Sequence, residues 1–195
     1  MTSAQRKLPT HMTVDEFIAW TGDGTAAKYE LVDGELRAMA PATTTHGSMQ
    51  ATLSRLLGEA LMKAKRRCRV LTEPGVAVRN NSRANMRIPD IGITWSADNA
   101  GQVAMPEPVL LVEIMSPSNK ADTMINVWAY TTIPSLNEIL VVQSTRIEAQ
   151  LYRRQSDDSW PEEPETVGAT DHLNLDSARL SVPLKNVYAL TYLDV

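Results

Sequence analysis

Apolar residues near the start of the chain recur first with helical spacing and then with the alternation of a hairpin. Residues 13–20 place apolar side chains on one face after a threonine, with Glu16 three residues beyond that threonine. This capping-box pattern predicts a short helix. Residues 28–39 alternate around Asp33-Gly34. An Asp-Gly pair between alternating runs predicts a two-residue hairpin turn.

Two further segments are predicted to form helices. Residues 45–65 carry leucines and alanines three and four residues apart, which predicts the longest helix of the chain and a core element. A second helix is predicted over residues 121–132, after the polar, proline-containing segment 116–120.

The remaining apolar runs are short and predict strands. They cover residues 68–78, 87–95, 109–115, 137–143 and 147–154. Pro89 is tolerated in such a run when it lies at the beginning of the strand. The order helix, hairpin, long helix, three strands, helix and strand pair predicts an α/β fold of the α+β type, a mixed sheet with helices on its faces.

Two of the predicted strands each contain one carboxylate, Asp90 and Glu113. A strand buried on both faces is expected to be continuously apolar, and an ionised carboxylate there is costly unless a partner or a metal ion neutralises it. Two such acids together predict one binding site for a hard divalent cation, Mg²⁺ or Mn²⁺, because these ions prefer oxygen ligands. The alternative for Asp90 is a structural carboxylate that caps a turn or pairs with Arg87.

Charge is unevenly distributed along the chain. The net charge of −4 argues against a protein that coats nucleic acid nonspecifically, yet residues 63–87 contain eight cations and a single acid. Such a segment could hold a phosphate backbone, with Arg79, Arg83 and Arg87 facing the phosphates. Alternatively, the cations at residues 63–67 end a helix and complement its dipole.

Length and composition predict one domain over residues 1–195. Residues 1–10 are expected to form a disordered lead, and residues 155–195 an acidic extension packed on the core. No apolar run is long enough to span a membrane, and the first residues lack the apolar stretch of a secretory signal. The single cysteine, Cys68, excludes an intramolecular disulfide. We therefore expect a cytoplasmic protein.

The motifs around these acids resemble those of the PD-(D/E)XK nuclease superfamily and, more narrowly, of the Uma family of bacterial restriction-endonuclease-like proteins. That family has a Tyr-Glu-Leu-x-Asp-Gly-Glu-Leu hairpin, a histidine, a Pro-Asp strand and a Glu-x-x-Ser-Pro-Ser strand in this order. The chain has them at residues 29–36, His46, 89–90 and 113–118. An Ile-Pro-Ser-Leu segment follows at residues 133–136, and the resemblance covers residues 13–154.

The resemblance implies a restriction-endonuclease-like core that binds Mg²⁺ or Mn²⁺ and cleaves nucleic acid, expected to be DNA. Asp90 and Glu113 would be the metal ligands, Glu30 a further acidic ligand, and His46 a hydrogen-bonding member of the site. The family's catalytic lysine is missing from both of its usual positions, where this chain has Met115 and Asn126. Asn126 would orient a water molecule, and Lys120 could reach in from the preceding loop. Homodimerisation is expected because a duplex has two strands.

Alternative interpretations remain for individual residues and for the whole protein. Glu30 could be the exposed member of a hairpin, and His46 a surface residue that caps a helix. Tyr130 and Met115 are expected to pack in the core. The leading hypothesis is a Mg²⁺-dependent endonuclease. The rival is a catalytically degenerate nuclease fold that binds nucleic acid or a protein without cutting, and a third possibility is a relic that binds metal without a substrate.

Overall fold

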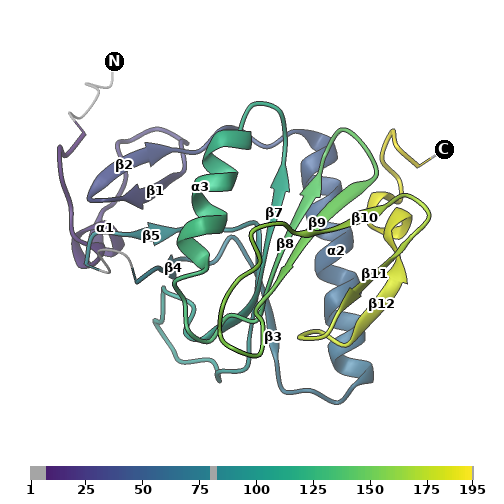
Figure 1. Ribbon diagram of the computed structural model, residues 1–195. Helices are drawn as coiled ribbons and strands as arrows, with labels where there is room; N and C mark the ends of the chain where they lie inside the picture. The colour runs from purple at the N-terminus through teal and green to yellow at the C-terminus, as the bar shows by residue number, and fades with distance from the viewer. Residues whose placement is uncertain (1–7, 80–82, 195) are drawn as a thin grey trace.

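A computed structural model describes residues 8–79 and 83–194, and its centre is a six-stranded sheet (Figure 1). The strand order is β10-β9-β8-β7-β6-β3. The bounds are β3 Arg69–Thr72, β6 Ile91–Thr94, β7 Pro108–Met115, β8 Glu138–Gln143, β9 Glu148–Arg153 and β10 Glu165–Gly168. Within these described strands, β7 and β8 pair in parallel and the other neighbours are antiparallel. The predicted mixed sheet is confirmed.

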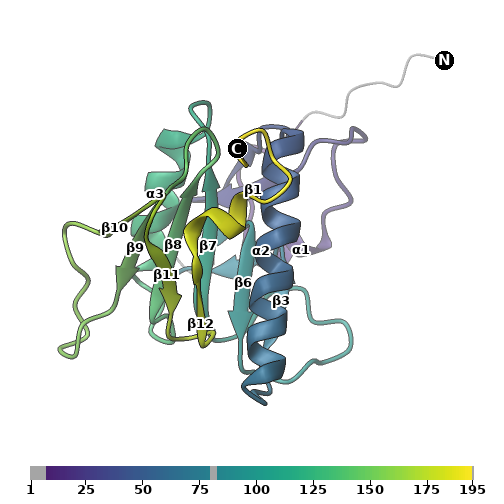
Figure 2. The same cartoon turned by 90° about the vertical axis from the view of Figure 1, so that its right-hand side faces the viewer.

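The parallel pairing of β7 and β8 requires a crossover connection, which helix α3 (Lys120–Tyr130) supplies. All eight residues of β7 and all six of β8 are buried, as expected for central strands covered on both faces. Helices α2 and α3 lie on opposite faces of the sheet (Figure 2). The predicted helix over residues 121–132 ends two residues earlier than expected.

Each face of the sheet has its own core. Helix α2 (Thr44–Lys63) begins after its cap Thr43 and packs its buried leucines on one face, together with Ile114 of β7. On the other face, α3 packs against Leu111 and Met115 of β7. Because side chains alternate along a strand, Glu113 points to the α3 face with Leu111 and Met115. Met115 is therefore a core residue, as its sequence context predicts.

A smaller sheet, in the order β2-β1-β5-β4, lies beside the main one (Figure 1). Its strands are β1 Tyr29–Val32, β2 Glu35–Ala38, β4 Val76–Ala77 and β5 Met86–Arg87. The predicted hairpin is confirmed: Asp33 and Gly34 form its turn with positive φ values of 50° and 86°. Helix α1 (Val14–Ala19) has the predicted capping box between Thr13 and Glu16.

The C-terminal segment covers part of α2. It contains β11 (His172–Leu175), β12 (Leu180–Pro183) and the 3-10 helix η1 (Leu184–Tyr188). Its apolar side chains belong to the same buried cluster as those of α2, whereas most of its acidic residues face outward. Residues 1–7 of the predicted disordered lead lie outside the described residues. No helix in the described parts of the chain is both long and apolar enough to cross a membrane.

Candidate metal centre

Asp90 and Glu113 face each other across two neighbouring strands. The antiparallel register pairs Ile91 with Val112, which places Asp90, the residue just before β6, opposite Glu113 of β7. Both residues are more than nine-tenths buried. They line one cavity of about 490 Å³ that is also lined by Glu30, His46 and Asn126. The fold therefore brings together five of the six side chains singled out in the sequence.

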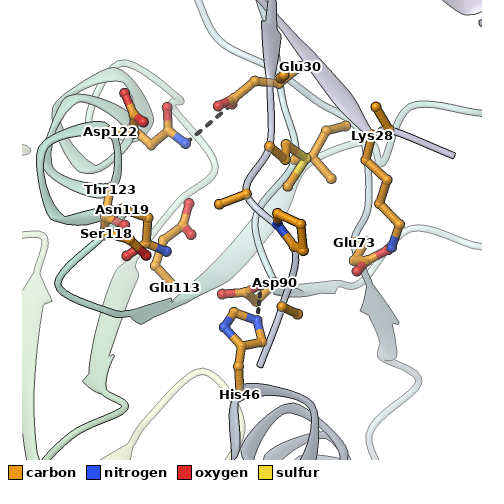
Figure 3. A pocket seen from close by; sticks show the side chains of 18 of the residues that line it. Lys28, Glu30, His46, Glu73, Asp90, Glu113, Ser118, Asn119, Asp122 and Thr123 are labelled. Atoms are coloured by element: carbon orange, nitrogen blue, oxygen red, sulfur yellow. Dashed lines mark hydrogen bonds and ion pairs between the residues drawn. The ribbon is translucent and has the colours of Figure 1, made fainter. Parts of the chain in front are cut away.

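The carboxylate of Asp90 is held from two directions. Its Oδ2 accepts a hydrogen bond of 2.6 Å from the Ile114 amide, and its Oδ1 lies 2.8 Å from Nε2 of His46 (Figure 3). Gln50, one turn further along α2, donates a hydrogen bond of 2.8 Å to the Asp90 carbonyl. Helix α2 thus fixes both the side chain and the backbone of Asp90. The role of Gln50 was not apparent in the sequence.

His46 is more than a helix-capping residue. Its amide donates to the Thr43 cap, while its imidazole turns toward Asp90. Burial of the ring lowers the pKa of His46, but the hydrogen bond to Asp90 and the negative charges of Asp90 and Glu73 outweigh it, so that the pKa is raised overall. The imidazolium form is therefore favoured beside Asp90.

Glu113 is enclosed on the α3 side of the sheet. The hydroxyl of Tyr130 donates a hydrogen bond of 2.6 Å to its Oε1. Burial, and next the negative charge of Asp90, raise the pKa of Glu113 well above its ordinary value, while the hydrogen bond from Tyr130 acts in the opposite direction. Because the two facing carboxylates repel each other when both are charged, the pair favours binding either a shared proton or a cation. Tyr130 is a core residue, as expected, but its hydroxyl belongs to the site.

Glu30 is held in place by an arginine that sequence reasoning missed. Nε of Arg37 donates a hydrogen bond of 2.8 Å to Oε1 of Glu30, and the amide of Asn126 lies 3.3 Å from Oε2. Arg37 also donates to Oδ1 of Asn126 at 2.7 Å and to Asp122 at 3.0 Å. Arg37 therefore connects the hairpin with α3. The sequence contained a signal for this contact, because a two-residue turn at 33–34 places residue 30 opposite residue 37 in the hairpin.

The prediction that Arg87 faces phosphates is wrong. Its side chain is buried, and Nη1 donates a hydrogen bond of 2.5 Å to the Leu31 carbonyl. Burial lowers the pKa of Arg87, and the charge of nearby Glu30 opposes that shift. Arg79 lines a separate hollow beside Ile133. None of Arg79, Arg83 and Arg87 lies on the wall of the Asp90–Glu113 cavity.

The two positions where the family resemblance predicts a lysine differ in their surroundings. Met115 is buried in the core, whereas Asn126 lines the cavity and hydrogen bonds with Glu30 and Arg37. Lys120 is the first residue of α3, is exposed, and does not belong to the cavity wall. A different lysine, Lys28, does line the cavity and forms an ion pair with Glu73.

The chemistry of the donor set suits a hard divalent cation. Asp90 and Glu113 supply carboxylate oxygens from opposite strands, and Mg²⁺ commonly binds through one or two carboxylates while retaining several waters. Among residues 8–79 and 83–194, no three His, Cys, Asp or Glu side chains are gathered closely enough to form a complete ligand cluster. As a pair, Asp90 and Glu113 match the one or two carboxylates through which such a cation commonly binds.

The chain is similar to known proteins over most of its length. Residues 14–183 match the sequence model of the Uma2 family, described as "Putative restriction endonuclease". An uncharacterized protein of Synechocystis sp. is 27% identical over 179 residues, which cover 91% of each chain. The crystal structure of a "putative nuclease belonging to DUF820" from Anabaena variabilis superposes with a TM-score of 0.71 at 17% identity, over 91% of this chain and 98% of that one. The structural likeness shows a shared fold.

Proposed function

Because this chain belongs to the Uma2 family of restriction-endonuclease-like proteins, we propose that it is a metal-dependent endonuclease that hydrolyses phosphodiester bonds of DNA. The observation that carries the proposal is the pair of buried carboxylates, Asp90 and Glu113, facing one cavity. Burial of two like charges side by side is costly, and a divalent cation between them would offset that cost.

In this proposal Asp90 and Glu113 hold Mg²⁺ or Mn²⁺. When bound, such a cation supplies positive charge to a phosphoryl oxygen and lowers the pKa of a coordinated water. His46 keeps the carboxylate of Asp90 oriented, and Tyr130 does the same for Glu113. Glu30 is engaged by Arg37, so its contribution as an oxygen ligand would be made through water.

The remaining parts of the proposal concern the polar side chains around the metal and the assembly. Asn126 would orient a water molecule from the α3 wall of the cavity, where its amide already contacts Glu30. Lys120 would enter only if its exposed side chain swung in from the start of α3. Cleavage of both strands of a duplex needs two such cavities, which favours a homodimer, and a cytoplasmic location would give access to DNA.

The proposal is tested by incubating the protein with a supercoiled plasmid and Mn²⁺. We expect nicked and linear products from the wild type, and none from Asp90→Asn or Glu113→Gln, which keep size and polarity but remove a metal ligand. Glu59→Gln, at an exposed carboxylate of α2, is the matched control and should cleave like the wild type. Absence of cleavage by the wild type, or unchanged cleavage by the two site variants, would contradict the proposal.

A second candidate function is binding of nucleic acid or a protein without cleavage. Its support is that Met115 and Asn126 occupy both positions where relatives carry the lysine. The Asn126→Lys variant separates the two candidates. If only this variant cuts DNA, the parent is a binding protein that has lost the catalytic cation.

A further inference from the structure

The Asp90–Glu113 cavity contains one long cationic side chain. Of the lysines and arginines in the described parts of the chain, Lys28 alone lies on the cavity wall. It precedes β1, and its carbonyl accepts a hydrogen bond of 2.9 Å from the Met39 amide, so that the hairpin ladder extends through it. Because side chains alternate along a strand, Lys28 and Glu30 point to the same side. The hairpin therefore presents an ammonium and a carboxylate to one cavity.

The other cations near the site are held elsewhere. Arg37 is bound to Glu30, Asp122 and Asn126 and stands outside the cavity wall. Arg87 is buried and donates to a backbone carbonyl. Neither guanidinium can turn toward a substrate without breaking contacts that join the hairpin to the rest of the fold.

Lys28 is much less constrained. Its side chain is 62% exposed, and within residues 8–79 and 83–194 its one polar side-chain contact is the ion pair with Glu73. The Glu73 amide donates a hydrogen bond of 3.0 Å to the Asp90 carbonyl, which keeps this ion pair next to the Asp90 strand. In Figure 3, Lys28 and Glu73 lie on one side of Asp90, and Glu113 lies on the other. An exposed ion pair contributes little to stability, so the ammonium can exchange Glu73 for another anion.

We propose that Lys28 supplies the cation that is missing at Asn126, with Glu73 holding its ammonium until the phosphate of a nucleic acid enters the cavity. The inference rests on the proposed phosphodiester hydrolysis. In this arrangement the positive charge comes from the hairpin, on the wall of the cavity opposite α3. The lysine lost from the usual positions is thus replaced by one from a different element of the fold.

Lys28 acts in this reaction as a hydrogen-bond donor to the phosphate. A water oxygen forms a new bond to phosphorus, and the ester bond from phosphorus to the leaving sugar oxygen breaks. The attacking water gives one proton to solvent, and the leaving oxygen takes one proton up. The ammonium of Lys28 stays protonated throughout and stabilises the negative charge that develops on the non-bridging oxygens.

The experiment measures the single-turnover rate of plasmid cleavage in Mn²⁺. We expect Lys28→Gln to slow cleavage about 100-fold, because a charged donor to the transition state is lost. Lys28→Arg retains the charge and should slow cleavage less than about 10-fold. Adding Asn126→Lys to Lys28→Gln returns an ammonium from the other wall, and should recover at least about 10-fold.

Two further variants separate this role from a structural one. Glu73→Gln breaks the same ion pair but leaves the ammonium, so it should retain at least about 10-fold more activity than Lys28→Gln. Lys185→Gln, at an exposed lysine of η1 away from the cavity, is the matched control and should cleave at the wild-type rate. Equal losses in Lys28→Gln and Glu73→Gln would indicate that only the ion pair matters, and would overturn the inference. A wild-type rate in Lys28→Gln would overturn it as well.

A protein that does not cleave DNA would give a result distinct from those above. If the wild type does not cut DNA, the hydrolysis proposal falls, and Lys28 is tested by the affinity for a fluorescent duplex in Ca²⁺. A loss of about 10-fold or more in Lys28→Gln would support a phosphate contact by Lys28. An unchanged affinity, or no binding by the wild type, would overturn the inference along with the hydrolysis.

Discussion

The hydroxyl of Tyr130, on α3, donates a hydrogen bond of 2.6 Å to Oε1 of Glu113, on β7. Both side chains are buried, and α3 is the crossover that connects β7 to its parallel neighbour β8. The helix that makes the sheet topology possible therefore also orients one of the two proposed metal ligands. Packing of the core and geometry of the site depend on the same contact.

Replacing Tyr130 by phenylalanine should weaken both the fold and the site. The variant leaves a buried carboxyl oxygen of Glu113 without its donor, which we expect to lower the free energy of unfolding by about 1–3 kcal/mol. It also removes a contact that favours the charged form of Glu113, so Mn²⁺ affinity should fall. Urea unfolding and calorimetry measure the two effects. Tyr152→Phe is the matched control, since its buried ring has no hydroxyl contact among the described residues.

Arg37 is expected to contribute to the stability of the fold. Arg37→Gln removes the guanidinium from Glu30, a buried acid, and disconnects the hairpin from α3. We expect a loss of about 2 kcal/mol in the free energy of unfolding. Arg55→Gln disrupts an exposed pair with Glu59 and should cost less than about 0.5 kcal/mol. Equal costs for the two arginines in urea unfolding would show that the contacts of Arg37 contribute no more than a surface pair.

The hairpin turn can be tested with a pair of glycines. Gly34 has φ +86°, and a Cβ atom there would approach the His11 ring to 2.2 Å. Gly34→Ala should therefore destabilise the protein by about 1–2 kcal/mol, with the exposed His11 ring displaced. Gly58 lies within α2, and no atom beyond its chain neighbours and its own helix backbone comes within 4 Å of an added Cβ. Gly58→Ala should stabilise by about 0.5–1 kcal/mol. Thermal unfolding of both variants measures whether each change in stability is positive or negative, and destabilisation by both would contradict this account.

Tyr188 predicts a pH dependence of stability. Its buried hydroxyl contacts the Gln143 carbonyl at 2.9 Å, and burial raises the pKa of Tyr188. The folded state keeps the phenol neutral above about pH 10, where the unfolded chain loses that proton. Tyr188→Phe should cost about 1–2 kcal/mol at pH 8. That cost should shrink by about 1.4 kcal/mol for each pH unit above 10. Urea unfolding at pH 8 and pH 10.5 measures the difference, and a constant cost would refute the assignment.

Local patterns were sufficient to predict most elements and the central pair of acids. Asp90 and Glu113 could be predicted to meet because each belongs to a short apolar run, and neighbouring strands place such residues opposite one another. The Asp33-Gly34 turn also predicts a contact within the hairpin. Its two-residue length fixes the pairing of Glu30 with Arg37.

The surroundings of those acids depend on contacts between distant segments. Glu73 reaches the site from a turn with positive φ, and nothing local relates it to Lys28, 45 residues earlier. Arg87 was expected to face phosphates because it belongs to the basic segment before Asp90, but it is buried in the smaller sheet and donates to the Leu31 carbonyl. The family resemblance points to β7 and α3 for the lysine, whereas the lysine on the cavity wall, Lys28, belongs to the N-terminal hairpin.

The most direct test of the metal centre is an anomalous-scattering measurement on crystals soaked in Mn²⁺. We predict one strong peak in the Asp90–Glu113 cavity, within about 2.5 Å of an oxygen of each carboxylate, and no such peak in Asp90→Asn crystals. A Mn²⁺ peak elsewhere in the molecule, with this cavity empty, would contradict the account.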